Sequence, residues 1–314
     1  MPHEHDHSGG HAGHSHAPSA DADRRWLAIA LALIAAFMGV EVVVGLIANS
    51  LALLSDAAHI LTDAASIALA LFAARLAGRA PGGRFTFGLG RAEILSALVN
   101  GASLLVLAAI IGYEAVRRLF EPPDVEGALV IVVGVVGGLV NVGAAWALSR
   151  AERRSLNVEG ARAHVLADLY SSVAAASAGL IIVTTGFREA DGIAALIVSA
   201  LMLRSGLSLV RQSGGVLLEA APRGVDPDRI GHAMASQRGI VEVHDLHVWE
   251  ITSGFPALSA HVIVGRDADC HALRRQLERV LHDEFEIAHT TLQVDHEGGE
   301  LVQLEMPEQR RTTE

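Results

Sequence analysis

The sequence contains no lysine and one cysteine, and only 19% of its 314 residues are charged. The 24 basic residues are therefore all arginines, and the glycines at 134, 137 and 138 are not followed by the lysine that a nucleotide-phosphate loop requires. The lone Cys270 excludes an intrachain disulfide, and the amino terminus lacks the apolar run of a secretory signal. The remaining composition is 51% hydrophobic, with a mean hydropathy of +0.38, which predicts a membrane protein.

Six apolar segments lie between residues 26 and 212, each near the roughly 20 residues that cross a bilayer. The expected spans are 26–48, 51–74, 93–114, 127–149, 162–186 and 190–212. Arginines concentrate on one set of connections, at residues 24, 25, 75, 79, 84, 91, 150, 153 and 154, while the other connections carry acidic residues beside Arg117, Arg118 and Arg188. The positive-inside rule therefore predicts that both termini are cytoplasmic.

The predicted organisation is a tail over 1–25, a transmembrane domain over 26–212, a soluble domain over 213–300 and a short tail over 301–314. Histidines recur in the first tail among glycine, serine and alanine, at residues 3, 5, 7, 11, 14 and 16. We expect this tail to be disordered and to gather divalent transition metals loosely. A purification tag is the alternative, although the irregular spacing and the interleaved Glu4 and Asp6 argue against it.

Two of the 16 histidines lie in the predicted spans, and each precedes an aspartate by four residues: His59 with Asp63, and His164 with Asp168. Residues at i and i+4 share a helix face, so each span presents one imidazole and one carboxylate together. Unpaired ionisable groups are costly inside a bilayer. A hydrogen bond within one helix could account for a single pair, but two matched pairs predict a four-ligand ion site. Asp56 shares the face of the first pair, where we assign it to the vestibule or the helix end.

Two imidazoles and two carboxylates complete the tetrahedral shell that Zn²⁺ accepts most readily. Mg²⁺ and Ca²⁺ prefer more oxygen ligands, whereas Fe²⁺, Co²⁺, Ni²⁺ and Cd²⁺ stay open as occupants. Protons compete with the metal for the same histidines. On an alternating-access path, this competition predicts exchange of zinc for protons.

The chain resembles the cation diffusion facilitator family, and most of all its bacterial zinc-type transporters. The resemblance rests on SLALLSDAAHILTD, FTFGLGRAEILSALVNG, EGARAHVLADLYSS and VHDLHVWEITSG. It implies six transmembrane helices, a homodimer, a cytoplasmic C-terminal domain and proton-coupled metal export across the bacterial inner membrane. It also implies that His59, Asp63, His164 and Asp168 are the transport ligands, with the histidine at position 59 associated with zinc over cadmium.

The C-terminal region alternates between helical and strand patterns. Helices are expected over 226–237 and 270–285, and strands over 241–251, 257–265 and 290–297, which gives an αββαβ domain similar to a metallochaperone. By resemblance, a regulatory metal would bind His244, His261, His271 and Asp295, with His247 and His289 as additional candidates. Relatives have a histidine near position 293, where this chain has the amide of Gln293.

Two other functions use similar residues. An intramembrane metalloenzyme needs an open coordination position, which two complete His and Asp pairs do not leave. A membrane metal sensor would not need four buried transmembrane ligands. We therefore expect a transporter rather than an enzyme, with divalent metal ions as its substrate and no nucleic acid among its partners.

Overall fold

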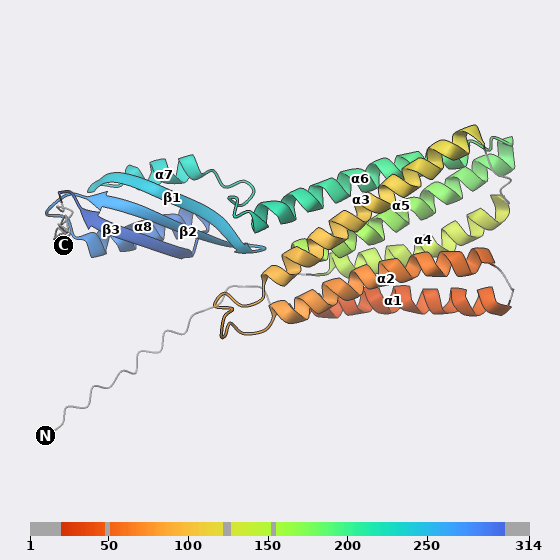
Figure 1. Ribbon diagram of the computed structural model, residues 1–314, viewed down its shortest axis with the longest axis horizontal. Coiled ribbons are helices and arrows are strands. Elements are labelled where there is room, and N and C mark those ends of the chain that lie inside the picture. The colour runs from red at the N-terminus through yellow and green to blue at the C-terminus, as the bar shows by residue number, and fades with distance from the viewer. Residues whose placement is uncertain (1–19, 48–50, 122–126, 152–154, 299–314) are drawn as a thin grey trace, which may run out of the picture. The chain divides into compact units, whose positions relative to one another are not determined.

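The computed structural model describes residues 20–47, 51–121, 127–151 and 155–298, and it divides into two units after Val210. The described part of the first unit contains six long helices (Figure 1). They are α1 (Ala20–Ile47), α2 (Leu51–Ala77), α3 (Arg91–Phe120), α4 (Gly127–Ser149), α5 (Leu156–Thr185) and α6 (Ala190–Leu217), the last of which crosses the division. The predicted histidine-rich stretch over residues 3–16 lies outside the described residues.

Three of the described helices, α3, α5 and α6, are long and apolar enough to cross a membrane. Helix α5 begins at Leu156, six residues before the expected start of the fifth span at residue 162. The side chain of Ser155 caps this helix by accepting a hydrogen bond from the Val158 backbone N–H at 3.3 Å. The polar first turn hid this start from a search for continuous apolar residues.

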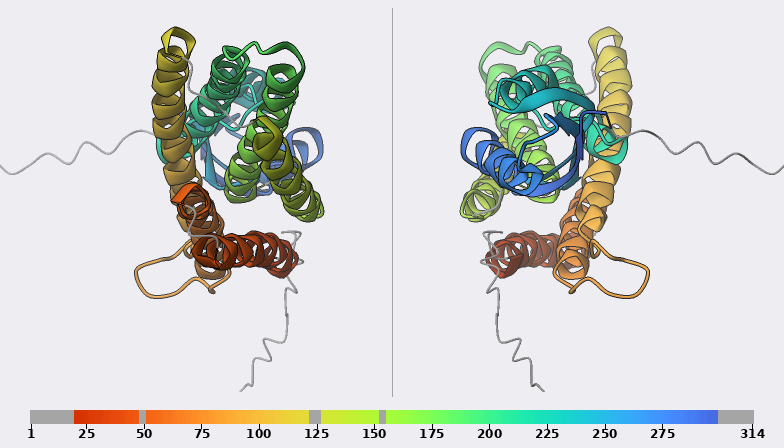
Figure 2. Two further views of the ribbon diagram at one scale, coloured as in Figure 1. Left: turned by 90° about the vertical axis from the view of Figure 1, so that its right-hand side faces the viewer. Right: turned by 90° about the vertical axis from the view of Figure 1, so that its left-hand side faces the viewer.

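Helix α5 belongs to two hydrophobic cores of the first unit. Its Val158, Ala161 and Val165 pack with buried residues of α1, α2 and α4. Its Ala167 packs instead with buried residues of α3 and α6. The end-on views of Figure 2 show α1 and α2, in red and orange, together on one side of the bundle. Helix α5 therefore joins the two groups of helices.

Helices α3 and α6 pack closely because small residues face each other. A Cβ atom on Gly206 would lie 3.0 Å from the carbonyl oxygen of Gly101 and 2.8 Å from a Leu105 methyl carbon. Further along, the Ser199 hydroxyl donates a hydrogen bond to the Ala108 carbonyl at 2.8 Å. Glycine and serine thus let the two backbones approach and bond directly.

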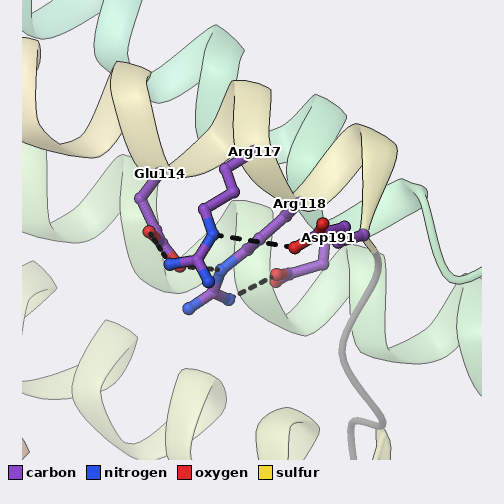
Figure 3. Close-up of polar contacts among 5 residues, drawn as sticks. Glu114, Arg117, Arg118 and Asp191 are labelled. Atoms are coloured by element: carbon purple, nitrogen blue, oxygen red, sulfur yellow. Dashed lines mark hydrogen bonds and ion pairs between the residues drawn. The ribbon is translucent and has the colours of Figure 1, made fainter.

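An ion-pair cluster joins the C-terminal end of α3 to the N-terminal end of α6 (Figure 3). The Arg118 guanidinium donates to the Asp191 carboxylate of α6 at 2.7 Å and to Glu114 on its own helix at 3.4 Å. Arg117 lies 3.8 Å from Glu114 and 3.9 Å from Glu121. Within this cluster of described residues, the Arg118–Asp191 bond crosses between the helices and holds the C-terminal end of α3 against the N-terminal end of α6.

The second unit has the predicted αββαβ order: α7 (Pro227–Ala235), β1 (Ile240–Thr252), β2 (Phe255–Val264), α8 (Cys270–Phe285) and β3 (His289–His296). The sheet order is β1-β2-β3, with β1 antiparallel and β3 parallel to β2 (Figure 1). Alternate residues of β2 are buried against α7 and α8, namely Leu258, Ala260, Val262 and Val264. The intervening residues of β2 lie on the sheet face that the helices leave open.

A β-bulge interrupts β1 between His244 and His247. His244 pairs with His261 and His247 pairs with Ser259, so two residues of β1 oppose one residue of β2. One of them, Asp245, has a φ of 52°. Because the bulge adds one residue, His244 and His247 lie on the same face although they are three positions apart.

Candidate metal site

A buried aspartate of α2 faces a buried histidine of α5. Asp63 and His164 are 4% and 2% exposed, and the Asp63 Oδ1 atom lies 3.9 Å from His164 Nδ1. This distance exceeds that of a hydrogen bond. Two ligands of one tetrahedral zinc ion are roughly 3.3–3.6 Å apart, given bond lengths of about 2.0–2.2 Å. The pair is therefore spaced for a shared ion after a shift of a few tenths of an ångström.

Helix α3 holds the opposite side of the His164 ring. Its Nε2 atom lies 3.2 Å from the Asn100 carbonyl oxygen and 3.1 Å from the Ser103 hydroxyl. The Ser103 hydroxyl donates to the same carbonyl at 2.9 Å, so its oxygen is left to accept. A carbonyl can only accept, and Nε2 therefore carries the proton. This tautomer directs the lone pair of Nδ1 toward Asp63, as a metal ligand requires.

Asp168 lies one helical turn after His164, and its carboxylate interacts electrostatically with that of Asp63. Two neighbouring carboxylates in a buried site repel each other, and a cation between them removes that repulsion. The structure thus places two of the four predicted ligands, Asp63 and His164, opposite each other, with Asp168 one helical turn further along α5. The His59 and Asp56 side chains lie outside the described residues, and among the side chains that are described no three His, Cys or acidic groups already converge as a metal site.

The sequence interpretation missed the residues that orient His164. Asn100 and Ser103 stand in an apolar stretch and carry no metal-ligand signature of their own. A third hydroxyl, Ser66 of α2, lies 3.5 Å from His164 Nε2. The available signal was the spacing of polar residues along α3, where Asn100 and Ser103 share a face.

In the second unit, the open sheet face carries several of the predicted regulatory ligands. The rings of His244 and His261 pack edge to face with centroids 5.4 Å apart. His261 is paired in register with Gln293 of β3, whose amide donates to Asp295 at 2.9 Å. The structure also places Glu242 here, with its carboxylate 3.3 Å from His244 Nδ1.

His247 and His289 lie on the same face of the sheet, paired with Ser259 and Ala257 of β2, whereas His271 lies on α8. His271 is exposed at the start of α8. His247 follows the bulge of β1, and its Nε2 atom lies 2.9 Å from the Asp245 carboxylate. The ring of His289 packs against Phe255 at 5.6 Å. Glu242 could have been predicted as a candidate ligand because it lies two residues before His244, and alternate residues of a strand share a face.

Comparison with known families and proteins gives matches along nearly the whole chain. Residues 27–218 match the cation efflux transmembrane domain, and residues 222–297 match the cytoplasmic domain of cation efflux proteins. The zinc transporter ZitB of Escherichia coli K12 is 40% identical over 299 residues, covering 95% of this chain and 93% of that protein. The cadmium, cobalt and zinc/H(+)-K(+) antiporter of Bacillus subtilis strain 168 is 36% identical over 308 residues, covering 95% and 98%.

A third relative is the metal cation efflux system protein CzcD of Cupriavidus metallidurans, which is 38% identical over 286 residues and covered at 90% in both chains. Among solved structures, the metal-bound C-terminal domain of the CzcD transporter is 31% identical. That match covers 22% of this chain and 97% of the other, with a TM-score of 0.22.

Proposed function

The chain belongs to the cation diffusion facilitator family of membrane metal transporters, and from that premise we propose that it exports Zn²⁺ from the cytoplasm in exchange for protons. Its relatives are named as transporters and antiporters rather than enzymes. The observation that carries the proposal is the buried pair of Asp63 on α2 and His164 on α5, separated by 3.9 Å. Asp168 and His59 complete the proposed four-ligand site.

In this proposal, zinc binds through the Nδ1 lone pair of His164 and the carboxylates of Asp63 and Asp168. Each of these groups can also take a proton, and a protonated ligand no longer binds the metal. Zinc therefore binds from the cytoplasm, where protons are scarcer, and protons displace it on the other side. The return of the protonated site to the cytoplasmic side completes the antiport cycle.

We further propose that the C-terminal domain joins two copies of the chain into a homodimer and responds to metal. His244 and His261 with Asp295 are the proposed ligands, and Glu242 is added to them because it already approaches His244. His271 would have to approach from the start of α8 or from the second copy. This arrangement leaves the transport site to the helices and assigns a regulatory role to the sheet.

The proposed location is the bacterial inner membrane, with both termini in the cytoplasm. Support comes from the arginine-rich connections on one side of the spans. The match of residues 222–297 to a cytoplasmic domain agrees with this orientation. The histidine-rich segment before α1 would then face the compartment from which zinc is taken and raise its local concentration.

Transport by reconstituted protein tests the function. Proteoliposomes with an imposed pH gradient and an internal zinc indicator should show zinc movement with native protein. Asp63→Asn and Asp168→Asn should abolish it, because an amide keeps the size of the side chain but cannot supply a negative ligand. Glu159→Gln is the matched control, since Glu159 is an exposed carboxylate on α5.

The outcomes separate the parts of the proposal. Native protein that moves no zinc, or site variants that transport like the Glu159→Gln control, would refute zinc transport through this site. Zinc movement that is unchanged when the pH gradient is collapsed or reversed would refute the proton coupling alone.

A further inference from the structure

Two tryptophans of the first unit lie against each other where α1 begins and α4 ends. Trp26 of α1 and Trp146 of α4 pack edge to face, with ring centroids 5.9 Å apart and an interplanar angle of 86°. Trp26 is partly buried against the core that α1 shares with α4, whereas Trp146 is 54% exposed. Tryptophans at the ends of membrane helices are typical of the boundary between lipid and water.

Each of these rings has an arginine beside it. The Arg25 guanidinium carbon lies 5.7 Å from the centroid of Trp26, and that of Arg150 lies 5.1 Å from the centroid of Trp146. Both distances are in the range of a cation–π interaction, and both arginines are exposed. The four residues form what we term the arginine–tryptophan site, in which two contacting rings hold two cations at one place on the surface.

The charge of these two arginines is not neutralised by the protein that surrounds them. Among the described residues, neither Arg25 nor Arg150 forms an ion pair with a carboxylate. Arg24 differs, because its guanidinium donates to the Ala74 carbonyl of α2 at 3.1 and 3.3 Å. A guanidinium group carries five N–H donors whose geometry suits a phosphate group. The site is therefore suited to an anion that carries a phosphate.

The surface beyond the two tryptophans, toward the middle of α1 and α4, is apolar. Leu33 of α1 and Leu139 and Val142 of α4 are 41%, 68% and 51% exposed, and each is four or seven residues from the tryptophan of its own helix, on the same face. We term these three residues the apolar strip. A Cβ atom on Gly143 would lie 3.6 Å from a Leu33 methyl carbon, so the two helices are in contact here. The strip extends about 10 Å from the tryptophans, as seven helical residues do.

We propose that the arginine–tryptophan site binds the phosphate headgroup of an anionic phospholipid whose acyl chains lie along the apolar strip. The two guanidinium groups supply the charge, and the strip distinguishes a lipid from dissolved phosphate, which has no apolar part to bury. The inference goes beyond the proposed function and uses its orientation, in which this end of the bundle lies at the cytoplasmic leaflet. Anionic lipids of that leaflet attract basic residues next to membrane helices.

Lipid binding to the purified full-length protein tests the site. Native mass spectrometry during titration with phosphatidylglycerol or phosphatidylcholine gives a binding constant for each lipid. We expect native protein to prefer phosphatidylglycerol. In Arg25→Gln/Arg150→Gln this preference should fall about 5-fold to 30-fold, as expected for the loss of one to two basic groups at a membrane surface.

The matched control is Arg79→Gln/Arg84→Gln. It removes the same charge from two exposed arginines in the connection between α2 and α3, on the same side of the spans. Its lipid preference should stay within twofold of native. Equal losses in the two double variants would overturn the proposal, because the lipid would then respond to net charge. Displacement of the lipid by millimolar inorganic phosphate would also overturn it, since the site would then bind free phosphate.

A second measurement needs no arginine variant and is made in the bilayer. Trp249→Phe removes the third tryptophan of the chain, so the remaining emission comes from Trp26 and Trp146. In vesicles, phosphatidylglycerol with brominated acyl chains should quench this emission more than brominated phosphatidylcholine at the same mole fraction. Equal quenching by the two lipids would overturn the proposal. Both measurements are made without zinc, so their outcome is separate from success or failure of the transport assay.

Discussion

Removing the Ser103 hydroxyl should weaken zinc binding without unfolding the protein. His164 Nε2 shares its proton between Ser103 at 3.1 Å and the Asn100 carbonyl at 3.2 Å. In Ser103→Ala the carbonyl still holds the ring, so the tautomer persists with one acceptor instead of two. A hydrogen bond of this kind contributes about 0.5–1.5 kcal/mol, which corresponds to roughly a 2-fold to 10-fold loss of affinity.

The assay is the initial rate of zinc transport into proteoliposomes as a function of zinc concentration. We expect the apparent KM to rise by that factor, whereas the rate at saturating zinc changes less. Ser103→Thr should restore the native value because it keeps the hydroxyl. Ser66→Ala should have a smaller effect, since its hydroxyl is 3.5 Å from Nε2. An unchanged KM in Ser103→Ala, or equal losses in the alanine and threonine variants, would refute the orienting role.

Two further predictions concern stability. Gly206→Ala should destabilise the protein by about 1–3 kcal/mol, because its Cβ would lie 3.0 Å from the Gly101 carbonyl oxygen; Gly214→Ala, which meets open space, should be neutral or stabilising in the same unfolding assay. A hydrogen bond from the Ala272 N–H lowers the pKa of the Asp269 carboxyl, which caps α8. This lowered pKa means that the carboxylate stabilises the fold at neutral pH and loses that effect as the pH falls from about 4 through the folded-state pKa. The melting-temperature deficit of Asp269→Ala should therefore be largest near pH 7 and shrink below pH 4, and a deficit independent of pH would contradict the assignment.

The order of helices and strands could be predicted because each follows from a local pattern. Apolar runs of bilayer length indicated the long helices, and alternation with turn residues indicated αββαβ. The start of α5 could not be found in this way, since Ser155 and the polar turn after it look like a connection. The β1 bulge was also hidden, because the extra residue shifts the alternation on which strand faces are assigned.

Part of the candidate site could be predicted from the sequence. The spacing of His59 and Asp63 in one span and of His164 and Asp168 in another predicted that the two pairs would face each other, and the structure places Asp63 3.9 Å from His164. The partners of the other side of the imidazole were not predictable, because a serine hydroxyl and a backbone carbonyl carry no recognisable motif. Their role depends on the close approach of α3 to α5, which is set by tertiary packing.

The wide separation of the two site helices along the chain has a consequence for biosynthesis. Asp63 of α2 and His164 of α5 are about 100 residues apart, and chains grow at about 5–20 residues per second. Helix α2 therefore waits roughly 5–20 s in the membrane before the histidine that faces Asp63 has been made. During that interval α2 can pack against α1 and α3, and chains arrested before α5 would expose an intramembrane carboxylate to the quality-control machinery of the cell.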